Sequence, residues 1–492
     1  MIETAKKKRD MPSSFTILLA LLAIVAVVTV IVSGTSGGAV TAARLSDFCT
    51  APIKGFADAL PVCLFVMILG GFLGMMTETG ALDNGIAVLV QKLKGNEIML
   101  IPVLMLIFSL GGTTYGMCEE TVPFYALLAA TMMAAGFDPM VGAATVLLGA
   151  GCGCLGSTVN PFAVGAAVDA LTGVDIAVNQ SIIIGLGAVL WLVTTVMSIV
   201  FVMNYAKKVK ADKGSTILSM QELKDAEEAH GKAASEVHKE VKLTGRQKGV
   251  LIAFAFTFVV MIVGFIPLAD LNEGVANFFD AGAVYDADGN AVVQGWSALI
   301  TGLPIGQWYF DEASTWFFLM AILIGIIGGL SEKQIVNTFI TGAADMMSVV
   351  LVIALARGIS VLMASTGLDV YVLDAAANAL AGLSGVIFAP MSFLVYFGLS
   401  FLIPSTSGMA TVSMPIMGPL AVKLGFSPEV MVMIFSAAIG VVNLFTPTSG
   451  AIMGGLALAK IEWTTWLKFA LKLIVALSVV CAIILTVACV LL

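Results

Sequence analysis

Two polar, glycine-rich stretches nearly three hundred residues apart are versions of one pattern. They read GGTTYGMCEETVP from residue 111 and IPSTSGMATVSMP from residue 403, and each interrupts apolar sequence. Further matches follow in the same order: KGFADALPV from 54 with TGAADMMSV from 341, GFDP from 136 with GFSP from 425, and Asn160-Pro161 with Thr446-Pro447. The offset between copies stays within 286 to 292 residues. A duplicated unit of about 150 residues is typical of many secondary transporters.

Composition places both copies in a membrane. Hydrophobic residues make up 59% of the chain and charged residues 11%, and the mean hydropathy is +1.03. Soluble domains contain only about 45–50% apolar residues. Seven apolar runs are near the roughly 20 residues that a helix needs to cross the hydrocarbon. They occur near residues 14–34, 59–76, 181–204, 249–268, 315–330, 346–364 and 466–492.

The distribution of charge predicts the orientation. The first apolar run follows Lys6, Lys7, Lys8 and Arg9, and it is longer than the roughly 7–15-residue core of a cleaved signal. Residues 205–248 carry ten of the 24 Lys and Arg residues, whereas 269–312 carry none and seven acids. Since Lys and Arg favour the cytoplasmic side, the amino terminus and 205–248 are predicted to be cytoplasmic and 269–312 outside. The matched runs 59–76 and 346–364 then cross in opposite directions, and the carboxyl terminus lies outside.

The repeat and the charges together predict an all-α polytopic membrane protein with two inverted repeats. Five segments are expected: 1–54, a cytoplasmic tail and first span; 55–204, the first repeat, with a hairpin at about 98–135 and a broken helix at about 140–168; 205–248, a cytoplasmic linker; 249–340, further spans and the acidic outer segment; and 341–492, the second repeat, with a hairpin at about 384–424 and a broken helix at about 428–458.

Each hairpin is predicted to be re-entrant. Its arms, at 100–112 and 117–134 in the first copy, are short, and the linker carries backbone groups that lipid cannot satisfy. The tips should therefore be buried in protein and face an aqueous cavity. Two complete crossings, or an ordinary polar loop at the membrane surface, are the alternatives.

The broken helices follow each hairpin. GCGCLGSTVNPF from residue 151 and NLFTPTSG from residue 443 place hydroxyl, amide and proline residues inside apolar sequence. Proline removes a backbone donor, and a discontinuous helix presents donors at one half and carbonyls at the other. Such breaks suit an ionic substrate or Na⁺, which Ser157, Asn160, Asn443 and Thr446 could hold.

Three ionisable residues lie in otherwise apolar surroundings. Glu119 and Glu120 are placed on the second arm of the first hairpin, and their counterparts are Thr411 and Val412. A charge near the bilayer centre costs upwards of roughly 2.5 kcal/mol, so it normally faces a cavity or a partner. Either glutamate could hold a cationic group, Na⁺ or a proton, or close the hairpin tip as a structural acceptor. Arg357, opposite Gly70 in the repeat, could bind a substrate carboxylate or pair with an acid such as Glu119.

The blocks GGTTYGMCEETVPFY, GCGCLGSTVNPF, ARGIS, GGLSE and NLFTPTSG resemble the YfcC-like branch of the C4-dicarboxylate carrier and arginine/ornithine antiporter family, within the ion transporter superfamily. The resemblance covers nearly the whole chain from about residue 10. It implies a multi-pass protein of the bacterial inner membrane, a homodimer whose scaffold domain dimerises and whose transport domain moves as an elevator. The Ser-Asn-Thr type of motif of the dicarboxylate carriers is not reproduced: the copies read Ser157-Thr158-Val159-Asn160 and Asn443-Leu444-Phe445-Thr446.

The expected function is exchange or uptake of a small zwitterionic or cationic amino acid, arginine and ornithine first. The alternative is a C4-dicarboxylate or other organic anion coupled to Na⁺ or H⁺, and a channel or membrane receptor is a third class. We expect no cofactor other than such a coupling ion, no nucleic-acid partner and no enzymatic activity. The candidate substrate-binding residues are Gly112, Thr113, Thr114, Glu119, Glu120, Ser157, Thr158, Asn160, Arg357, Ser405, Thr406, Ser407, Asn443, Thr446, Thr448 and Ser449.

Other patterns are given structural roles. Cys152 and Cys154 lack partner ligands at zinc-site spacing and are interpreted as small packing residues. The only histidines, His230 and His238, lie in the cytoplasmic linker, which argues against histidine-based catalysis. Residues 286–290 should turn an exposed hairpin rather than bind calcium. Residues 216–243 are predicted to form a solvated helix or a mobile linker.

Overall fold

The computed structural model describes residues 14–492, except 83, 86–87, 89–95, 237–241, 267, 272 and 287–290. Within these residues the regular structure is helical apart from one two-stranded antiparallel sheet. The basic tail at 6–9 and His238 lie outside the described residues.

The first half contains eight described α-helices and three short helical turns. They are α1 (Ser14–Ser33), α2 (Leu45–Asp58), α3 (Leu60–Glu78), η1 (Glu97–Met99), α5 (Leu100–Tyr115), η2 (Glu119–Thr121), α6 (Val122–Ala134), α7 (Pro139–Leu155), the π turn η3 (Pro161–Gly165), α8 (Ala166–Thr172) and α9 (Gln180–Ala211). The connecting region contains η4 (Lys213–Ser215), α10 (Met220–Glu236), α11 (Gly245–Phe265), α12 (Leu268–Leu271), α13 (Glu273–Phe279), β1 (Val284–Tyr285), β2 (Ala291–Val293) and α14 (Phe310–Gly328).

The second half repeats the order of the first. It contains α15 (Glu332–Asp345), α16 (Met347–Thr366), α17 (Leu368–Leu380), α18 (Gly385–Leu402), α19 (Thr406–Lys423), α20 (Pro428–Val442), α21 (Gly450–Leu458) and α22 (Trp463–Leu491). In both copies two helices meet across one residue, a helical hairpin follows, a helix then breaks at a polar segment, and a long helix closes the unit. The hairpins are α5/α6 and α18/α19, and the broken helices are α7/α8 and α20/α21.

Eight helices of the described residues are long and apolar enough to cross a membrane. Seven of them correspond to the predicted apolar runs. The eighth is Glu97–Tyr115, which includes the first arm of the first hairpin. The expectation that neither hairpin arm is long is therefore wrong for this arm, because η1 extends α5 by a turn, and re-entrance stays a prediction.

A shared motif explains where the broken helices begin. In GFDP and GFSP the glycines, Gly136 and Gly425, adopt positive φ angles of 87° and 82°. The third residue caps the helix: the Asp138 Oδ1 accepts from the Val141 amide at 3.1 Å, and Ser427 plays the same part in α20. The proline occupies the first helical position, where no amide partner is lost. The repeated tetrapeptide thus encodes a helix start.

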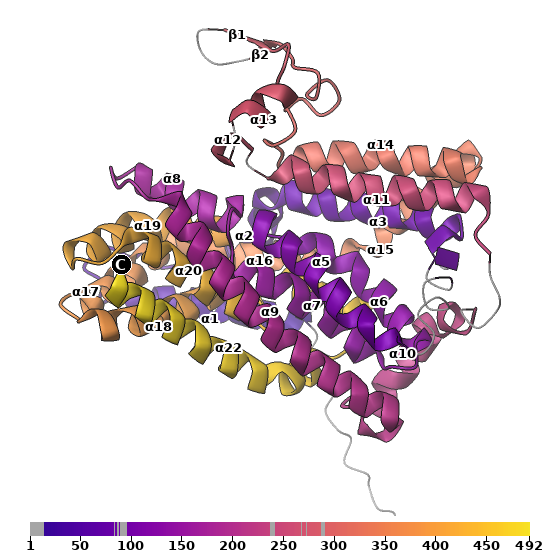
Figure 1. Ribbon diagram of the computed structural model, residues 1–492. Coiled ribbons are helices and arrows are strands. Elements are labelled where there is room, and N and C mark those ends of the chain that lie inside the picture. Colours follow the sequence, from indigo (N-terminus) through magenta and orange to yellow (C-terminus); the bar gives the residue numbers. More distant parts are fainter. Residues whose placement is uncertain are drawn as a thin grey trace, which may run out of the picture.

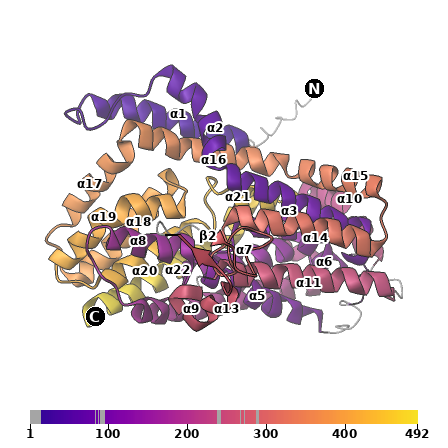
Figure 2. The same cartoon turned by 90° about the horizontal axis from the view of Figure 1, so that it is seen from above.

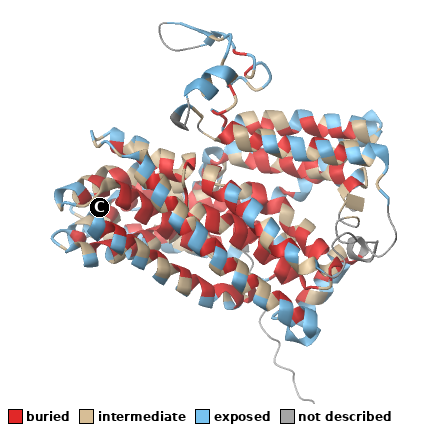
Figure 3. Ribbon diagram, in the orientation of Figure 1, coloured by how far each residue is buried: buried red, intermediate tan, exposed pale blue. Residues whose placement is uncertain are grey.

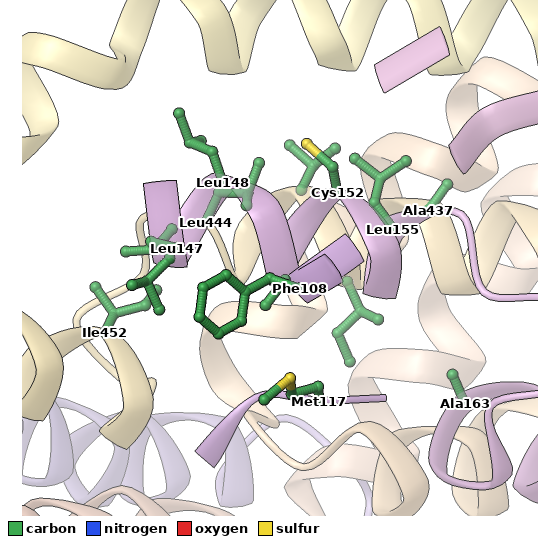
Figure 4. Close-up of a cluster of buried hydrophobic side chains, with 14 of the residues drawn as sticks. Phe108, Met117, Leu147, Leu148, Cys152, Leu155, Ala163, Ala437, Leu444 and Ile452 are labelled. Atoms are coloured by element: carbon green, nitrogen blue, oxygen red, sulfur yellow. The ribbon is translucent and has the colours of Figure 1, made fainter. Parts of the chain in front are cut away.

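Counterpart residues make reciprocal contacts where α7 and α20 cross. A Cβ on Gly151 would overlap the Leu444 side chain, and a Cβ on Gly440 would overlap the backbone of Leu155. With the offset of 289 residues, Gly151 corresponds to Gly440 and Leu155 to Leu444. The exchange of equivalent contacts is what a local twofold relation between the copies produces. Figure 4 shows the apolar cluster at this crossing, which includes Leu155, Ala437 and Leu444.

The closing helices of the two copies, α9 and α22, run in opposite directions. In Figure 1, α9 runs from the end beside α8 to the end beside α10, whereas α22 ends at the C terminus, on the side where α9 begins. These two helices occupy equivalent places in the repeat and pack against each other.

The helices form two groups, each packed mainly within itself. The first, which we call the scaffold group, contains α1, α2, α3, α11, α14, α15 and α16. The second, the hairpin group, contains α5 to α10 and α18 to α22. Figure 2 shows α1, α2, α3, α14, α15 and α16 on one side of the molecule and α9, α20 and α22 on another. The groups meet chiefly where α16 packs against α21.

Two connecting segments leave the helix layers. The segment containing α12, α13, β1 and β2 projects from the body and is largely exposed (Figure 3). Its strands pair Val284 with Val293, as expected for the hairpin at 286–290, whose residues 287–290 lie outside the described residues.

The helix α10 packs within the hairpin group, so the described part of 216–243 is neither fully solvated nor a free linker. It packs on α6, and the Glu222 Oε1 accepts from the Glu462 amide at 2.9 Å. The His230 Nε2 lies 3.1 Å from the Leu458 carbonyl oxygen, and burial lowers the pKa of this imidazole. These contacts hold α10 in place, and they could not be predicted from its mixed charges.

Candidate functional site

One cavity lies between the two hairpin tips and the two helix breaks. Its empty volume, which includes space open to solvent, is about 1250 Å³. Nine of the sixteen sequence-predicted residues line it: Glu119, Asn160, Arg357, Ser405, Thr406, Ser407, Asn443, Thr448 and Ser449. Segments more than three hundred residues apart thus converge on one space.

The other seven candidates, Gly112, Thr113, Thr114, Glu120, Ser157, Thr158 and Thr446, are not among the lining residues. The Thr113 hydroxyl donates to the Gly156 carbonyl at 2.6 Å, and the Thr158 amide donates to the Thr113 carbonyl at 2.8 Å. These bonds tie the first hairpin to the break after α7. The Thr114 hydroxyl donates to the Leu110 carbonyl of its own helix. Thr113 and Thr158 thus help to hold the cavity wall together.

Gly112 supports close helix packing. A Cβ at this position would overlap the Ala150 carbonyl oxygen, and one on Gly153 would overlap the Ser109 carbonyl oxygen, so α5 and α7 touch through their backbones. We predict that Gly112→Ala lowers the apparent melting temperature in detergent by several degrees. A forced shift in a packed interior costs about 1–3 kcal/mol.

Gly185 provides the matched control for this prediction. It lies within α9, and a Cβ added there would meet only open space. Gly185→Ala should leave the melting temperature unchanged or raise it, because alanine is the better helix former by up to ~1 kcal/mol. Equal melting temperatures for the two variants would contradict the packing role of Gly112.

Both glutamates lie in the 3-10 turn η2 at the hairpin tip, not on the second arm as the sequence suggested. The arm begins later because Pro123 occupies the start of α6. The two residues differ in their surroundings. Glu119 lines the cavity, whereas Glu120 is 1% exposed and its carboxylate accepts from the Cys118 amide at 3.0 Å. Only Glu119 is available to a solute.

The second half directs two helix amino ends at the cavity. Ser405 caps α19, its Oγ accepting from the Gly408 amide at 3.1 Å, and residues 404–407 line the wall. Ser449 precedes α21, makes no side-chain capping bond, and lines the cavity with Gly450 and Ala451. Free amides and the helix dipole give such ends a positive partial charge. Both ends therefore favour an anionic group.

Arg357 adds a full positive charge to this wall. It lies on α16 and lines the cavity, and its side chain is 26% exposed. Glu119, of opposite charge, lines the same cavity. Arg357 forms its ion pair with Asp58, at 3.7 Å, and not with Glu119 as one alternative supposed.

Several residues that line the cavity were not predicted from the sequence. Phe162 follows the first break and stacks on Phe310, the first residue of α14, with ring centroids 5.5 Å apart. Phe265 contacts both Phe310 and Tyr115 at 6.1 and 5.4 Å. This cluster joins the hairpin group to the scaffold group. Phe162 could have been suspected from Pro161, but Phe310 lies outside every repeated motif. Cys154 also lines the cavity, beyond the packing role expected of it.

The four residues offered for Na⁺ lie in the two helix breaks, Ser157 and Asn160 after α7, and Asn443 and Thr446 after α20. The Asn160 Nδ2 donates to the Ser157 Oγ at 3.0 Å, and its Oδ1 accepts from the amides of Phe162 and Ala163. Thr446 shares a 2.7 Å hydrogen bond with Thr448, while Asn443 faces the cavity. Among the described residues no group of three His, Cys, Asp or Glu side chains is placed to hold a metal ion.

The protein has several helices long enough to span a membrane, and its hairpins and broken helices surround one cavity. These features and its family define the class of protein as a secondary membrane transporter. The chain belongs to the C4-dicarboxylate anaerobic carrier family, whose model matches residues 41–490. It is thus a YfcC-like family member, as its sequence motifs predicted.

Two curated relatives resemble it over most of its length. It is 29% identical over 445 residues to an uncharacterized protein of Haemophilus influenzae, covering 90% of this chain and 78% of the relative. It is 27% identical over 440 residues to the putative basic amino acid antiporter YfcC of Escherichia coli, covering 87% and 77%.

Two solved structures align with nearly the whole chain. Neisseria gonorrhoeae MtrF, described among antimetabolite efflux pumps, gives a TM-score of 0.43 at 16% identity, covering 98% of this chain and 96% of that one. The Alcanivorax borkumensis YdaH transporter gives 0.46 at 15%, covering 97% and 98%.

Proposed function

We propose that this transporter exchanges or takes up a small zwitterionic or cationic amino acid, arginine and ornithine first. The observation that carries the proposal is that Arg357 and Glu119 line the same cavity. An amino acid carries a carboxylate and at least one cationic group, so it needs both signs of charge in its site.

The polar groups of the cavity divide by sign. Arg357 and the amino ends of α19 and α21 come from the second half and would hold the carboxylate. Glu119 comes from the first half, next to the carboxyl end of α5 at Gly116, and would hold the ammonium or guanidinium. Placed in a site of low dielectric, each pairing is stronger than it would be in water. The name of the Escherichia coli relative, a putative basic amino acid antiporter, agrees with this choice.

Movement of the hairpin group against the scaffold group would provide alternating access. The cavity is lined by the hairpin group on most sides and by α3, α14 and α16 on the remaining one. Sliding at this boundary would carry the tips and breaks as one body, in the manner of an elevator. The Phe162–Phe310 stack crosses the boundary and would have to separate during that motion.

A dicarboxylate is the second candidate substrate. Arg357 and two helix amino ends supply more positive than negative character, which would suit a second carboxylate, with Glu119 holding a coupling cation. The family description, a C4-dicarboxylate anaerobic carrier, also favours this reading.

Exchange in proteoliposomes separates the two candidates. Vesicles containing the purified protein are loaded with arginine and placed in labelled ornithine, with succinate or unlabelled arginine outside as competitor. We expect uptake that arginine suppresses and succinate does not. Labelled succinate uptake with no ornithine exchange would replace the first proposal by the second.

A further inference from the structure

The Arg357 side chain projects from an unusually close helix crossing. A Cβ on Gly55 would overlap the Ala354 carbonyl oxygen and the Gly358 amide nitrogen, so the backbones of α2 and α16 are in direct contact. Gly358 follows Arg357, and Asp58 lies one turn after Gly55 at the end of α2. The crossing therefore fixes Asp58 and Arg357 relative to one another within the scaffold group.

The ion pair at this crossing involves the Nε edge of the Arg357 guanidinium. The Asp58 Oδ2 lies 3.7 Å from the Arg357 Nε, and the Asp58 side chain is 51% exposed. Arg357 lines the cavity, whereas Asp58 is not among the lining residues. Contact at Nε leaves the two terminal nitrogens of the guanidinium for a second partner, and their planar fork matches a carboxylate.

The second copy of the crossing lacks this pair. There α15 packs on α3, and a Cβ on Gly342 would overlap the Gly70 carbonyl oxygen. Asp345 is the counterpart of Asp58, but the counterpart of Arg357 is Gly70. The crossing thus forms without an arginine, and the acid of the second copy has no equivalent partner there. The Asp58–Arg357 pair is an addition to the shared architecture.

We infer that Asp58 is a positioning residue, which holds the Arg357 guanidinium so that its two terminal nitrogens face the cavity and bind the substrate carboxylate as a fork. The inference rests on the proposed function only in that Arg357 must bind a substrate carboxylate. The inference identifies Asp58 as the group that orients Arg357. It places the Asp58 carboxylate on the side of the guanidinium that faces away from the solute. Because an exposed ion pair is weak by itself, its value here is orientation rather than stability.

Michaelis constants for ornithine exchange test the inference. We expect Asp58→Asn to raise KM about five- to tenfold with little change in the maximal rate, and Asp58→Glu to recover most of the affinity. Asp345→Asn is the matched control and should behave as the unaltered protein. Equal melting temperatures in detergent would confirm that the variants are compared as folded proteins.

A double substitution separates orientation from a general effect on folding. With Arg357→Lys in place the fork is absent, so adding Asp58→Asn should change KM less than twofold. An unchanged KM for Asp58→Asn alone, or a full further loss in the double variant, would overturn the inference. A protein that transports succinate but no amino acid would refute the proposed function instead. The same KM comparison made with succinate then decides the role of Asp58.

Discussion

Replacing Arg357 with lysine should lower kcat/KM for ornithine exchange by about 10- to 100-fold, although the charge is retained. Lysine offers a point charge without the planar fork, so one of two hydrogen bonds to the substrate carboxylate is lost. A hydrogen bond to a charged group contributes about 1.5–3 kcal/mol, and every 1.4 kcal/mol is tenfold in binding. Arg357→Gln, which also removes the charge, should lose more. Initial rates of labelled exchange in proteoliposomes measure both.

Arg246 supplies a control for this substitution. It lies at the start of α11, its guanidinium against Gly329, and is not among the cavity-lining residues. Arg246→Lys should leave kcat/KM within about twofold. If Arg357→Lys also retained full activity, the carboxylate would have to be held by the helix amino ends at Ser405 and Ser449 without a guanidinium.

The elements around the cavity could be predicted because their signals are local and occur twice. The capping tetrapeptides start α7 and α20 at the expected places, and the predicted hairpin at about 384–424 corresponds to α18 and α19. A polar segment inside apolar sequence has few structural solutions in a membrane. Two such segments at equivalent positions of the repeat leave fewer solutions still, since a chance pattern would not occur in both copies.

Contacts between distant segments could not be predicted in the same way. Thr113 and Glu120 have polar side chains of the kind that bind solutes. In the structure, however, the Thr113 hydroxyl bonds to the Gly156 carbonyl and the Glu120 carboxylate bonds to the Cys118 amide at the hairpin tip. Whether a threonine faces a cavity or a neighbouring helix depends on the rotation of α5, which the glycine contacts at Gly112 and Gly153 determine. Phe310 belongs to no motif. Asp58 lies in the repeated block KGFADALPV, but that block does not reveal its contact with Arg357, which forms only where α2 of the first half crosses α16 of the second.

Replacing Glu119 with glutamine should remove the preference for a cationic side chain. In the unaltered protein we expect ornithine to compete far better than norvaline, a neutral amino acid of the same chain length. Glu119→Gln should reduce that preference about tenfold or more, since a charge-assisted hydrogen bond is replaced by a neutral one in a partly buried site. Competition of the two amino acids against labelled arginine measures the ratio directly.

The neighbouring Glu120 distinguishes substrate recognition from a structural effect of the same chemical change. Its carboxylate is buried against the Cys118 amide, and a glutamine oxygen can accept the same hydrogen bond. Glu120→Gln should therefore preserve the ornithine preference even if it lowers the amount of folded protein. If Glu119→Gln instead kept the preference but abolished the dependence of transport on Na⁺ or pH, Glu119 would hold the coupling ion. The cationic group of the substrate would then need another partner. That result would favour a dicarboxylate as substrate, because Arg357 and the two positively polarised helix amino ends would remain as the charged features that face the solute.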